Sequence, residues 1–210
     1  MRLSKHPPQN QEKIGNLWLQ INTCVSTTTR KVTNSPQDAN EVRRQIDAWL
    51  DQYDCEFTHF VTLTLDAKRI DAYINGSHKK RDRHDPDLVK LYQRSMRHFL
   101  SRLQKSLYGN LARHGRSPLL FVPIIEGLKH GEVPHFHCFA HVTSDRHERL
   151  EQIIKDCWMK VQFAGPQIDV QNYRDRGALR YGAKNALSLH RESVDWLNVQ
   201  MPKRSHSPAE

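Results

Sequence analysis

Hydrophobic and polar positions alternate over a short segment near residue 60, and this alternation predicts the first strong strand. Residues 57–65 read FTHFVTLTL and are rich in β-branched and aromatic side chains. Two further apolar runs, 119–125 and 136–142, are separated by the turn-like sequence GLKHGEVP. Their spacing predicts an antiparallel hairpin with a long loop. A shorter strand is expected over residues 168–170.

Apolar residues recur every three to four positions in four other segments, which predicts four helices. The longest begins near Asp85, and its apolar stripe continues to Gly109. The others are expected over residues 37–52, 144–161 and 175–189, with Gly165-Pro166 as the stop after residue 161.

Strands and helices in this order predict an α+β fold with a central antiparallel sheet and flanking helices. Helices would cover one face of the sheet and leave the other available for a site. A chain of 210 residues is long enough for one ordinary core. We therefore expect a partly helical N-terminal accessory segment over 1–52, one main domain over 53–192 and a C-terminal tail over 193–210.

Composition narrows the class of partner. The chain has 32 Lys and Arg against 23 Asp and Glu, a formal net charge of +9 that favours a polyanion such as nucleic acid. It has no apolar stretch near the roughly 20 residues that cross a bilayer, and its N-terminal residues lack a secretory signal. We expect no membrane partner and an intracellular protein. The four cysteines form no CxxC pair, which argues against a zinc ribbon.

The most informative segment is the hexapeptide PHFHCF at residues 134–139. Side chains two residues apart on a strand share a face, so one divalent cation could touch the imidazoles of both His135 and His137. Two adjacent neutral imidazoles on a sheet face need partners, and a metal would supply one. The alternative is a pair of half-exposed strand histidines in a chain that has 13 histidines.

Glu126 ends the apolar run before this hexapeptide. A hairpin that returns at Pro134 would bring its carboxylate beside His135 and His137. Two imidazoles and one carboxylate, with open positions for a phosphate oxygen and water, suit Mg²⁺ or Mn²⁺ acting on a phosphodiester more than a closed structural zinc. The alternative for Glu126 is a solvated loop carboxylate.

Tyr181 and Lys184 lie three residues apart in the last expected helix, so a phenol and an ammonium would share one helical face. A tyrosine hydroxyl is a poor nucleophile at its ordinary pKa of ~10. A metal that polarises the target phosphate and a nearby cation would lower the barrier to its attack. The alternative is a buried tyrosine with a surface lysine.

Two groups of basic residues are candidates for phosphate contacts. The loop after the first strand contains Lys79, Lys80, Arg81 and Arg83, and the approach to the tyrosine helix contains Arg174, Arg176 and Arg180. Tyr173 or Trp158 could stack on a base. Solvated surface charge and core packing are equal alternatives for these residues.

Taken in order, the strand FVTLTL, the segment IIEGLKHGEVPHFHCF and the helix RYGAKNAL resemble the HUH endonucleases. The resemblance is to the rolling-circle replication initiators of small plasmids and phages in particular, and it covers residues 57–189. The family pattern has a threonine-rich strand, represented here by Thr62 and Thr64. It continues with a His-hydrophobe-His motif, an acidic residue upstream of it, and a helix that carries Tyr and Lys.

The resemblance implies a ferredoxin-like nickase domain that cuts single-stranded origin DNA. Such an enzyme keeps the 5′ phosphate on tyrosine and leaves a 3′ hydroxyl that primes synthesis. Carried over, His135, His137 and Glu126 become metal ligands, Tyr181 the nucleophile and Lys184 its partner at the phosphate or the metal. Partners would be single-stranded or hairpin origin DNA and the helicase and polymerase of a bacterial host, in whose cytoplasm the protein would act.

This chain departs from the family pattern at two points. Many phage initiators place two tyrosines three or four residues apart, whereas the other nearby tyrosine here is Tyr173, so a single-tyrosine mechanism is implied. The chain has no GxxxxGK[ST] sequence and hence no built-in helicase of that type, so strand separation would come from the host.

Three alternatives remain open to different degrees. An HUH tyrosine transposase would share both the metal and the tyrosine. A conjugative relaxase fits less well, because relaxases usually cluster three histidines and carry the nucleophile near the N-terminus. A non-catalytic regulator that binds single-stranded nucleic acid would need the basic surface, but not Glu126, His135, His137 and Tyr181 together.

Overall fold

The computed structural model describes residues 36–76, 86–115, 117–128, 132–183 and 194–202, apart from the side chains of 36–43, 55, 86–87 and 180–183. The chain divides into two compact units, 1–47 and 48–210. The boundary between them falls within helix α2 (Pro36–Asp51). All strands of the sheet belong to the second unit.

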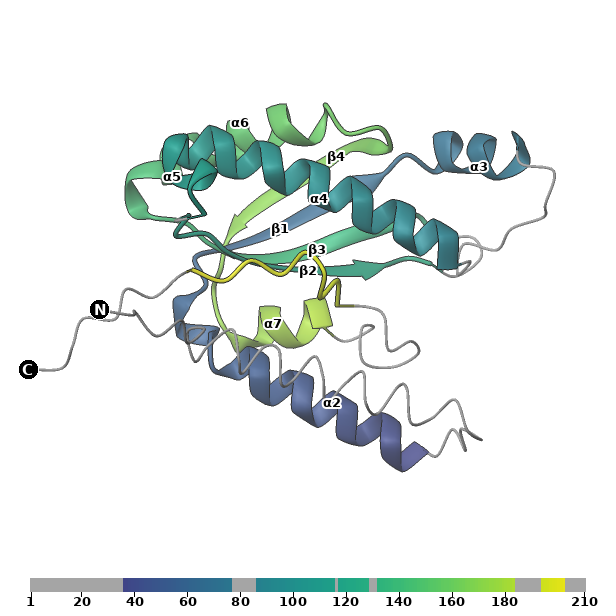
Figure 1. The fold of residues 1–210 in the computed structure, drawn as a ribbon. Helices are drawn as coiled ribbons and strands as arrows, with labels where there is room; N and C mark the ends of the chain where they lie inside the picture. The colour runs from purple at the N-terminus through teal and green to yellow at the C-terminus, as the bar shows by residue number, and fades with distance from the viewer. Residues whose placement is uncertain (1–35, 77–85, 116, 129–131, 184–193, 203–210) are drawn as a thin grey trace, which may run out of the picture. The chain divides into compact units, whose positions relative to one another are not determined.

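The second unit has an α+β order of elements. After α2 come η2 (Asp54–Glu56), β1 (His59–Leu65), α3 (Ala67–Gly76), α4 (Pro86–Tyr108), α5 (Asn110–Arg113), β2 (Leu120–Glu126), β3 (His135–His141), η3 (Ser144–Arg146), α6 (His147–Trp158), β4 (Ala164–Asn172) and α7 (Arg176–Ala183). Helices α4 and α6 lie on one face of the sheet, and α7 lies on the other (Figure 1). Within the described part of the chain, no helix combines the length and apolar character needed to span a membrane.

The four strands form one antiparallel sheet in the order β2-β3-β1-β4. This arrangement confirms the predicted α+β fold with a central antiparallel sheet and flanking helices. Strands β2 and β3 form the expected hairpin, with Glu126 opposite His135. Strand β1 lies between β3 and β4, so its side chains adjoin the histidine-bearing strand on one side.

The two faces of β1 have different environments. Val61 and Leu63 are fully buried in the apolar core, which includes Phe99 of α4 and Trp158 of α6. Thr62 and its neighbours at every second position are half-buried on the opposite face. Period-2 alternation therefore separates the core face from a polar face on the same strand.

A segment near the C-terminus covers the outer edge of β2. Gln200 pairs with Phe121, and Val194 pairs with Ile124, both in antiparallel bridges. Asn198 donates from Nδ2 to the main-chain carbonyl of Gln93 in α4 at 2.8 Å. These residues lie within the stretch predicted from sequence as a C-terminal tail, and their pairing satisfies backbone groups that an open edge strand would leave exposed.

Helix α3 and the segment Gly165-Pro166 differ from the sequence prediction. Helix α3 was not expected, although Asp66 accepts a hydrogen bond from the Arg69 amide at its start. Gly165-Pro166 does not serve as a helix stop, because α6 ends earlier and both residues lie in β4. A Cβ at Gly165 would lie 2.6 Å from Oγ1 of Thr64, so glycine permits β4 to approach β1 closely. Proline is tolerated here because β4 is an edge strand.

Candidate metal centre

The β2–β3 hairpin brings three potential metal ligands to one end of the sheet. Glu126, the last residue of β2, pairs in register with His135, the first residue of β3. His137 lies two residues further along β3 and therefore on the same face. Phe136, which lies between the histidines, points into the core under α4 and α6. The three polar side chains therefore come together on the face of the sheet opposite the core, and α7 lies on that face (Figure 1).

The ligand atoms of the three side chains lie close together. Oε2 of Glu126 is 3.8 Å from Nε2 of His135 and 3.6 Å from Nε2 of His137. One ligand atom from each residue lies within 4.8 Å of the others, and no other group of three His, Cys, Asp or Glu residues meets this criterion among the described residues. Ligand atoms that share a divalent ion at about 2.0–2.2 Å are about 3 Å apart. A small closure of the cluster would therefore let it hold a metal ion.

A main-chain carbonyl orients the ring of His135. Nδ1 of this ring lies 2.8 Å from the carbonyl oxygen of Val133. A carbonyl only accepts hydrogen bonds, so Nδ1 carries a proton and donates, and Nε2, which faces Glu126, is the nitrogen left for a metal in the neutral ring. Gly127 makes this contact possible: its φ is +73°, and a Cβ there would lie 2.2 Å from the Val133 oxygen.

His137 is more deeply enclosed than His135. Its ring stacks on Phe60 with a centroid distance of 5.1 Å and an interplanar angle of 23°. Oγ1 of Thr62, opposite it on β1, lies 3.1 Å from its Nδ1. Burial, followed by the neighbouring His135, lowers the pKa of His137 to about 4. His137 is therefore neutral near pH 7, which is the form that binds metals.

The chemistry of this donor set fits a divalent cation. A neutral His137 forms no salt bridge with Glu126, and distances of 3.6 and 3.8 Å exceed ordinary hydrogen-bond lengths. A cation between these atoms would interact with a carboxylate that is only 7% exposed. It would also use the two imidazole nitrogens that face Glu126.

The helix expected to carry the tyrosine is α7, which contacts β3. Leu179 of this helix is buried. Tyr181 lies on α7, but its side chain is outside the described residues, as is the whole of Lys184. The helix therefore lies on the same face of the sheet as the metal ligands. The placement of the Tyr181 phenol beside these ligands stays a prediction.

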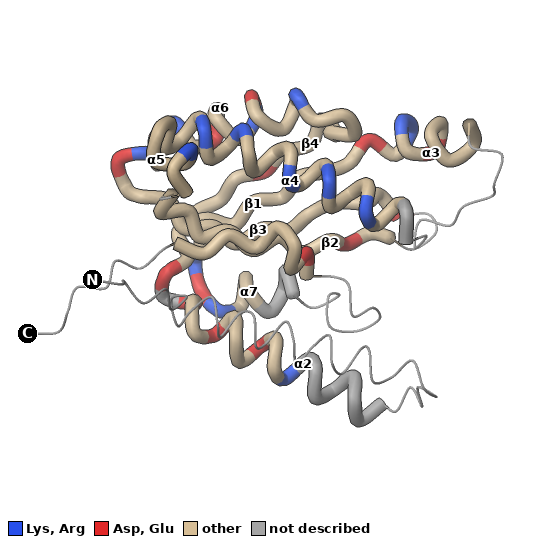
Figure 2. Tube along the Cα trace, viewed as in Figure 1, with Lys and Arg blue, Asp and Glu red and all other residues tan. Residues whose placement is uncertain are grey.

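Of the predicted DNA-contacting residues, Arg174 and Arg176 have side chains that the structure describes. Arg174 is exposed before α7, whereas Arg176 donates a hydrogen bond to the Asp51 carboxylate. The side chain of Arg180 and all of Lys79, Lys80, Arg81 and Arg83 lie outside the described residues. Figure 2 shows Lys and Arg on the helices, and none of the strands β1 to β4 contains either residue. The strands themselves therefore offer no Lys or Arg side chain to a polyanion.

Tyr173 and Trp158 are the two aromatic residues predicted to stack on a base, and the structure excludes Trp158. Its side chain is fully buried between the sheet and α4, in edge contact with Phe99, and its indole nitrogen donates to the Thr64 carbonyl. It is a core residue because α6 turns that side of the helix inward. Tyr173 is half-buried beside Phe139, and its hydroxyl donates to the carboxylate of Asp54.

The structure adds residues to the site that the sequence did not assign to it. Thr62 contacts His137, and Gly127 admits the carbonyl of Val133 to His135. The threonine was visible in the sequence as part of a threonine-rich strand, without a role. The contact between Val133 and His135 had one signal in the sequence, which is the glycine directly after Glu126 at the end of the strand. A turn from a strand into a loop often requires a positive φ, which glycine adopts readily.

Comparison with known proteins leaves the family undecided. A scan against models of protein families finds no match, and no curated protein matches the chain.

Proposed function

We propose that this protein is a metal-dependent nickase that cuts and rejoins single-stranded DNA, and that it acts as a replication initiator. The observation that carries the proposal is the convergence of Glu126, His135 and His137 on the sheet face where α7 lies. The resemblance of the motif order to HUH endonucleases supports the same assignment, since it pairs such a cluster with a tyrosine on a following helix.

The metal would be Mg²⁺ or Mn²⁺, held by one carboxylate oxygen of Glu126 and by Nε2 of His135 and His137. When bound, the ion polarises the scissile phosphate and offsets the charge that develops on it. Of the two ions, Mn²⁺ fits two imidazole ligands better, because Mg²⁺ prefers oxygen ligands and gives up water reluctantly. We therefore expect stronger support of activity by Mn²⁺ at equal concentration.

Tyr181 would be the nucleophile in a transesterification. Its phenol oxygen forms a bond to phosphorus, and the bond from phosphorus to the 3′ oxygen breaks. The phenol proton passes to solvent, and the departing 3′ oxygen takes up a proton. The products are a 5′ phosphate on Tyr181 and a free 3′ hydroxyl, and the reverse reaction rejoins the strand. Lys184 would stabilise negative charge at the phosphate.

The expected substrate is single-stranded or hairpin origin DNA. A net charge of +9 favours a polyanion, and with no Lys or Arg on the strands the metal would supply positive charge at the sheet face itself. Arg174 before α7 and Arg180 within it, together with Lys79, Lys80, Arg81 and Arg83, would contact phosphates away from the cut. The host helicase and polymerase would complete replication in the cytoplasm of a bacterial cell.

The first experiment traps the covalent product. Purified protein is incubated with a pool of labelled single-stranded oligonucleotides and Mn²⁺, and the products are separated on denaturing gels. We expect a protein–DNA adduct that disappears in Tyr181→Phe and in excess EDTA. Tyr73→Phe is the matched control, because Tyr73 is 45% exposed on α3 and lies outside the proposed site.

The outcomes separate the candidate functions. An adduct that persists in Tyr181→Phe would contradict the assignment of the nucleophile. Binding of the oligonucleotides with no adduct at any pool sequence would favour the non-catalytic nucleic-acid-binding regulator. Adduct formation followed by joining to a second, unrelated DNA end, with no priming of synthesis at the nick, would favour the transposase.

A further inference from the structure

The two histidines of the metal cluster are oriented in different ways. Nδ1 of His135 donates to a main-chain carbonyl, that of Val133, at 2.8 Å. Nδ1 of His137 lies 3.1 Å from a side-chain hydroxyl, that of Thr62. A carbonyl can only accept a hydrogen bond, whereas a hydroxyl can donate or accept. The orientation of His137 is therefore the one that a side-chain substitution can change.

We propose that Thr62 is a positioning residue of the metal site, whose hydroxyl accepts a hydrogen bond from Nδ1–H of His137 and so keeps the Nε2 lone pair available on the side of Glu126. The inference rests on the metal-binding part of the proposed function, but not on the cleavage reaction. It assigns a role to a residue on the neighbouring strand β1, which contributes no metal ligand.

The register of the sheet gives this contact its geometry. Thr62 lies directly opposite His137 in the antiparallel pairing of β1 with β3, and both side chains are on the face away from α4 and α6. The ring is held between two further groups, with Phe60 stacked on it and the edge of His135 at a centroid distance of 4.8 Å. The hydroxyl thus meets an imidazole whose plane is already constrained.

Loss of the hydroxyl would act through the tautomers of the neutral ring. Binding a cation at Nε2 of the neutral ring requires the proton to be on Nδ1, from which a hydrogen bond is donated to the Thr62 oxygen. His137 is only 9% exposed, so water is poorly placed to replace that acceptor. Without the hydroxyl, the ring shifts toward the tautomer with the proton on Nε2, and this tautomer has no lone pair for the metal. The effect therefore falls on metal binding more than on folding.

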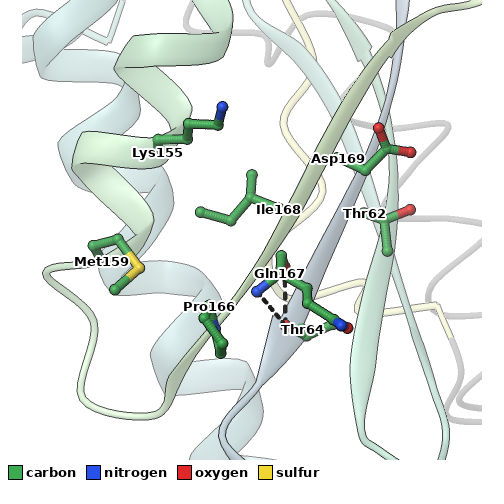
Figure 3. A pocket seen from close by; sticks show the side chains of 8 residues that line it. All are labelled: Thr62, Thr64, Lys155, Met159, Pro166, Gln167, Ile168 and Asp169. Carbon is green, nitrogen blue, oxygen red and sulfur yellow. Dashed lines mark hydrogen bonds between the residues drawn. The ribbon is translucent and has the colours of Figure 1, made fainter.

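Thr64 offers a matched control on the same strand and the same face. It lies opposite His135 in register, yet its Oγ1 accepts from the Gln167 amide at 3.2 Å and donates to the Gln167 carbonyl at 2.9 Å. Figure 3 shows these two bonds as dashed lines, with Thr62 further along β1 beside Asp169 of β4. Substitution of Thr64 removes a hydroxyl from the same surface without touching an imidazole.

The test measures Mn²⁺ affinity of the full chain, by titration followed through the electron paramagnetic resonance signal of free Mn²⁺. We expect Thr62→Val to weaken binding by about 10- to 100-fold, the usual cost of losing a partner behind a metal ligand. Thr62→Ser, which keeps the hydroxyl, and Thr64→Val should stay within about twofold of the unmodified protein. Thermal unfolding of each variant checks that the fold is intact.

Several results would overturn the inference. Thr62→Val could bind Mn²⁺ as tightly as the unmodified protein, or Thr64→Val could lose as much affinity as Thr62→Val. In a His137→Ala background, Thr62→Val should have no further effect, and an undiminished effect would show that it acts elsewhere. If the unmodified protein does not bind Mn²⁺, the inference and the metal assignment fail together. Tight binding without DNA cleavage would count against the nickase proposal alone.

Discussion

Two pairs of histidine rings in this unit have nearly the same mutual geometry. His135 and His137 meet edge to face with centroids 4.8 Å apart and an interplanar angle of 80°. His59, at the start of β1, and His147, at the start of α6, meet at 4.6 Å and 85°. In each pair burial is the main cause that lowers the pKa of one ring, His137 or His59, to about 4. Proximity and one ring of lowered pKa are therefore common to both pairs.

The pairs differ in where their lone pairs point and in what joins them. At the first pair, Nε2 of both rings faces the same carboxylate oxygen of Glu126. At the second, Nδ1 of His59 meets the Thr58 hydroxyl, and Nε2 of His147 donates to the Val142 carbonyl. Among the described residues the second pair belongs to no group that could hold a metal. Two close imidazoles are not sufficient, because a site also needs convergent lone pairs and a balancing charge.

The largest expected effect comes from removal of the negative charge of Glu126. Glu126→Gln keeps the shape of the side chain but replaces the carboxylate with a neutral amide. Loss of a residue that only supports a metal ligand can weaken metal binding by about 100-fold. Glu126 would be a direct ligand, so we expect a larger fall in Mn²⁺ affinity. Isothermal titration measures it. His147→Gln is the control at the other pair and should leave affinity unchanged; equal losses in the two variants would remove the distinction between the pairs.

The second prediction concerns acid stability and the His59 pair. The pKa of His59 is lowered to about 4 in the folded protein, from an ordinary value of 6.5. As pH falls from 6.5 to 4, the unfolded chain binds a proton that the folded protein excludes, so the free energy of unfolding decreases. At 1.36 kcal/mol per pKa unit the loss is at most about 3 kcal/mol.

Urea unfolding at several pH values tests this sign. The unmodified protein should lose stability between pH 6.5 and 4, and His59→Gln should lose less over the same window. Above pH 6.5 the two proteins should show a constant difference. Parallel curves for the two proteins across the whole acid range would mean that His59 is not the group responsible.

The smallest of the three effects is expected at Gly127. Alanine there would place Cβ 2.2 Å from the Val133 oxygen at a φ of +73°. We expect the free energy of unfolding to fall by about 1–3 kcal/mol, the cost of one strained position, with a weaker affinity for Mn²⁺ as the carbonyl moves away from His135. Gly76→Ala is the control, because a Cβ at Gly76 meets nothing within 4 Å. Wild-type affinity in Gly127→Ala would show that the carbonyl contact is dispensable.

Periodicity predicted the main elements of the fold. The apolar runs at 119–125 and 136–142 became the paired strands β2 and β3, and the long apolar stripe after Asp85 became α4. Helix α3 was missed although its signals were present, since Asp66 precedes it and Ile70 and Ile74 lie one turn apart on its buried side. The basic residues that follow drew the interpretation toward a loop.

Strand β4 shows a limit of local propensity. Its sequence AGPQIDVQN contains few residues that favour strands, and only 168–170 were predicted. The structure extends the strand from Ala164 to Asn172, because the adjoining β1 supplies hydrogen-bonding partners along its length. Such a strand depends on its neighbour, so a prediction from its own residues alone underestimates its length.

The sequence by itself determined the alternation that separates Phe136 from His135 and His137, and the hairpin that returns the chain past Glu126. These follow from the period of a strand and from one hairpin connection, which are local properties. Only the tertiary structure decided that Thr62 faces His137 and that Val133 orients His135. The first contact joins residues 75 positions apart through sheet register, and the second depends on a loop's backbone path, and neither is encoded in a local pattern.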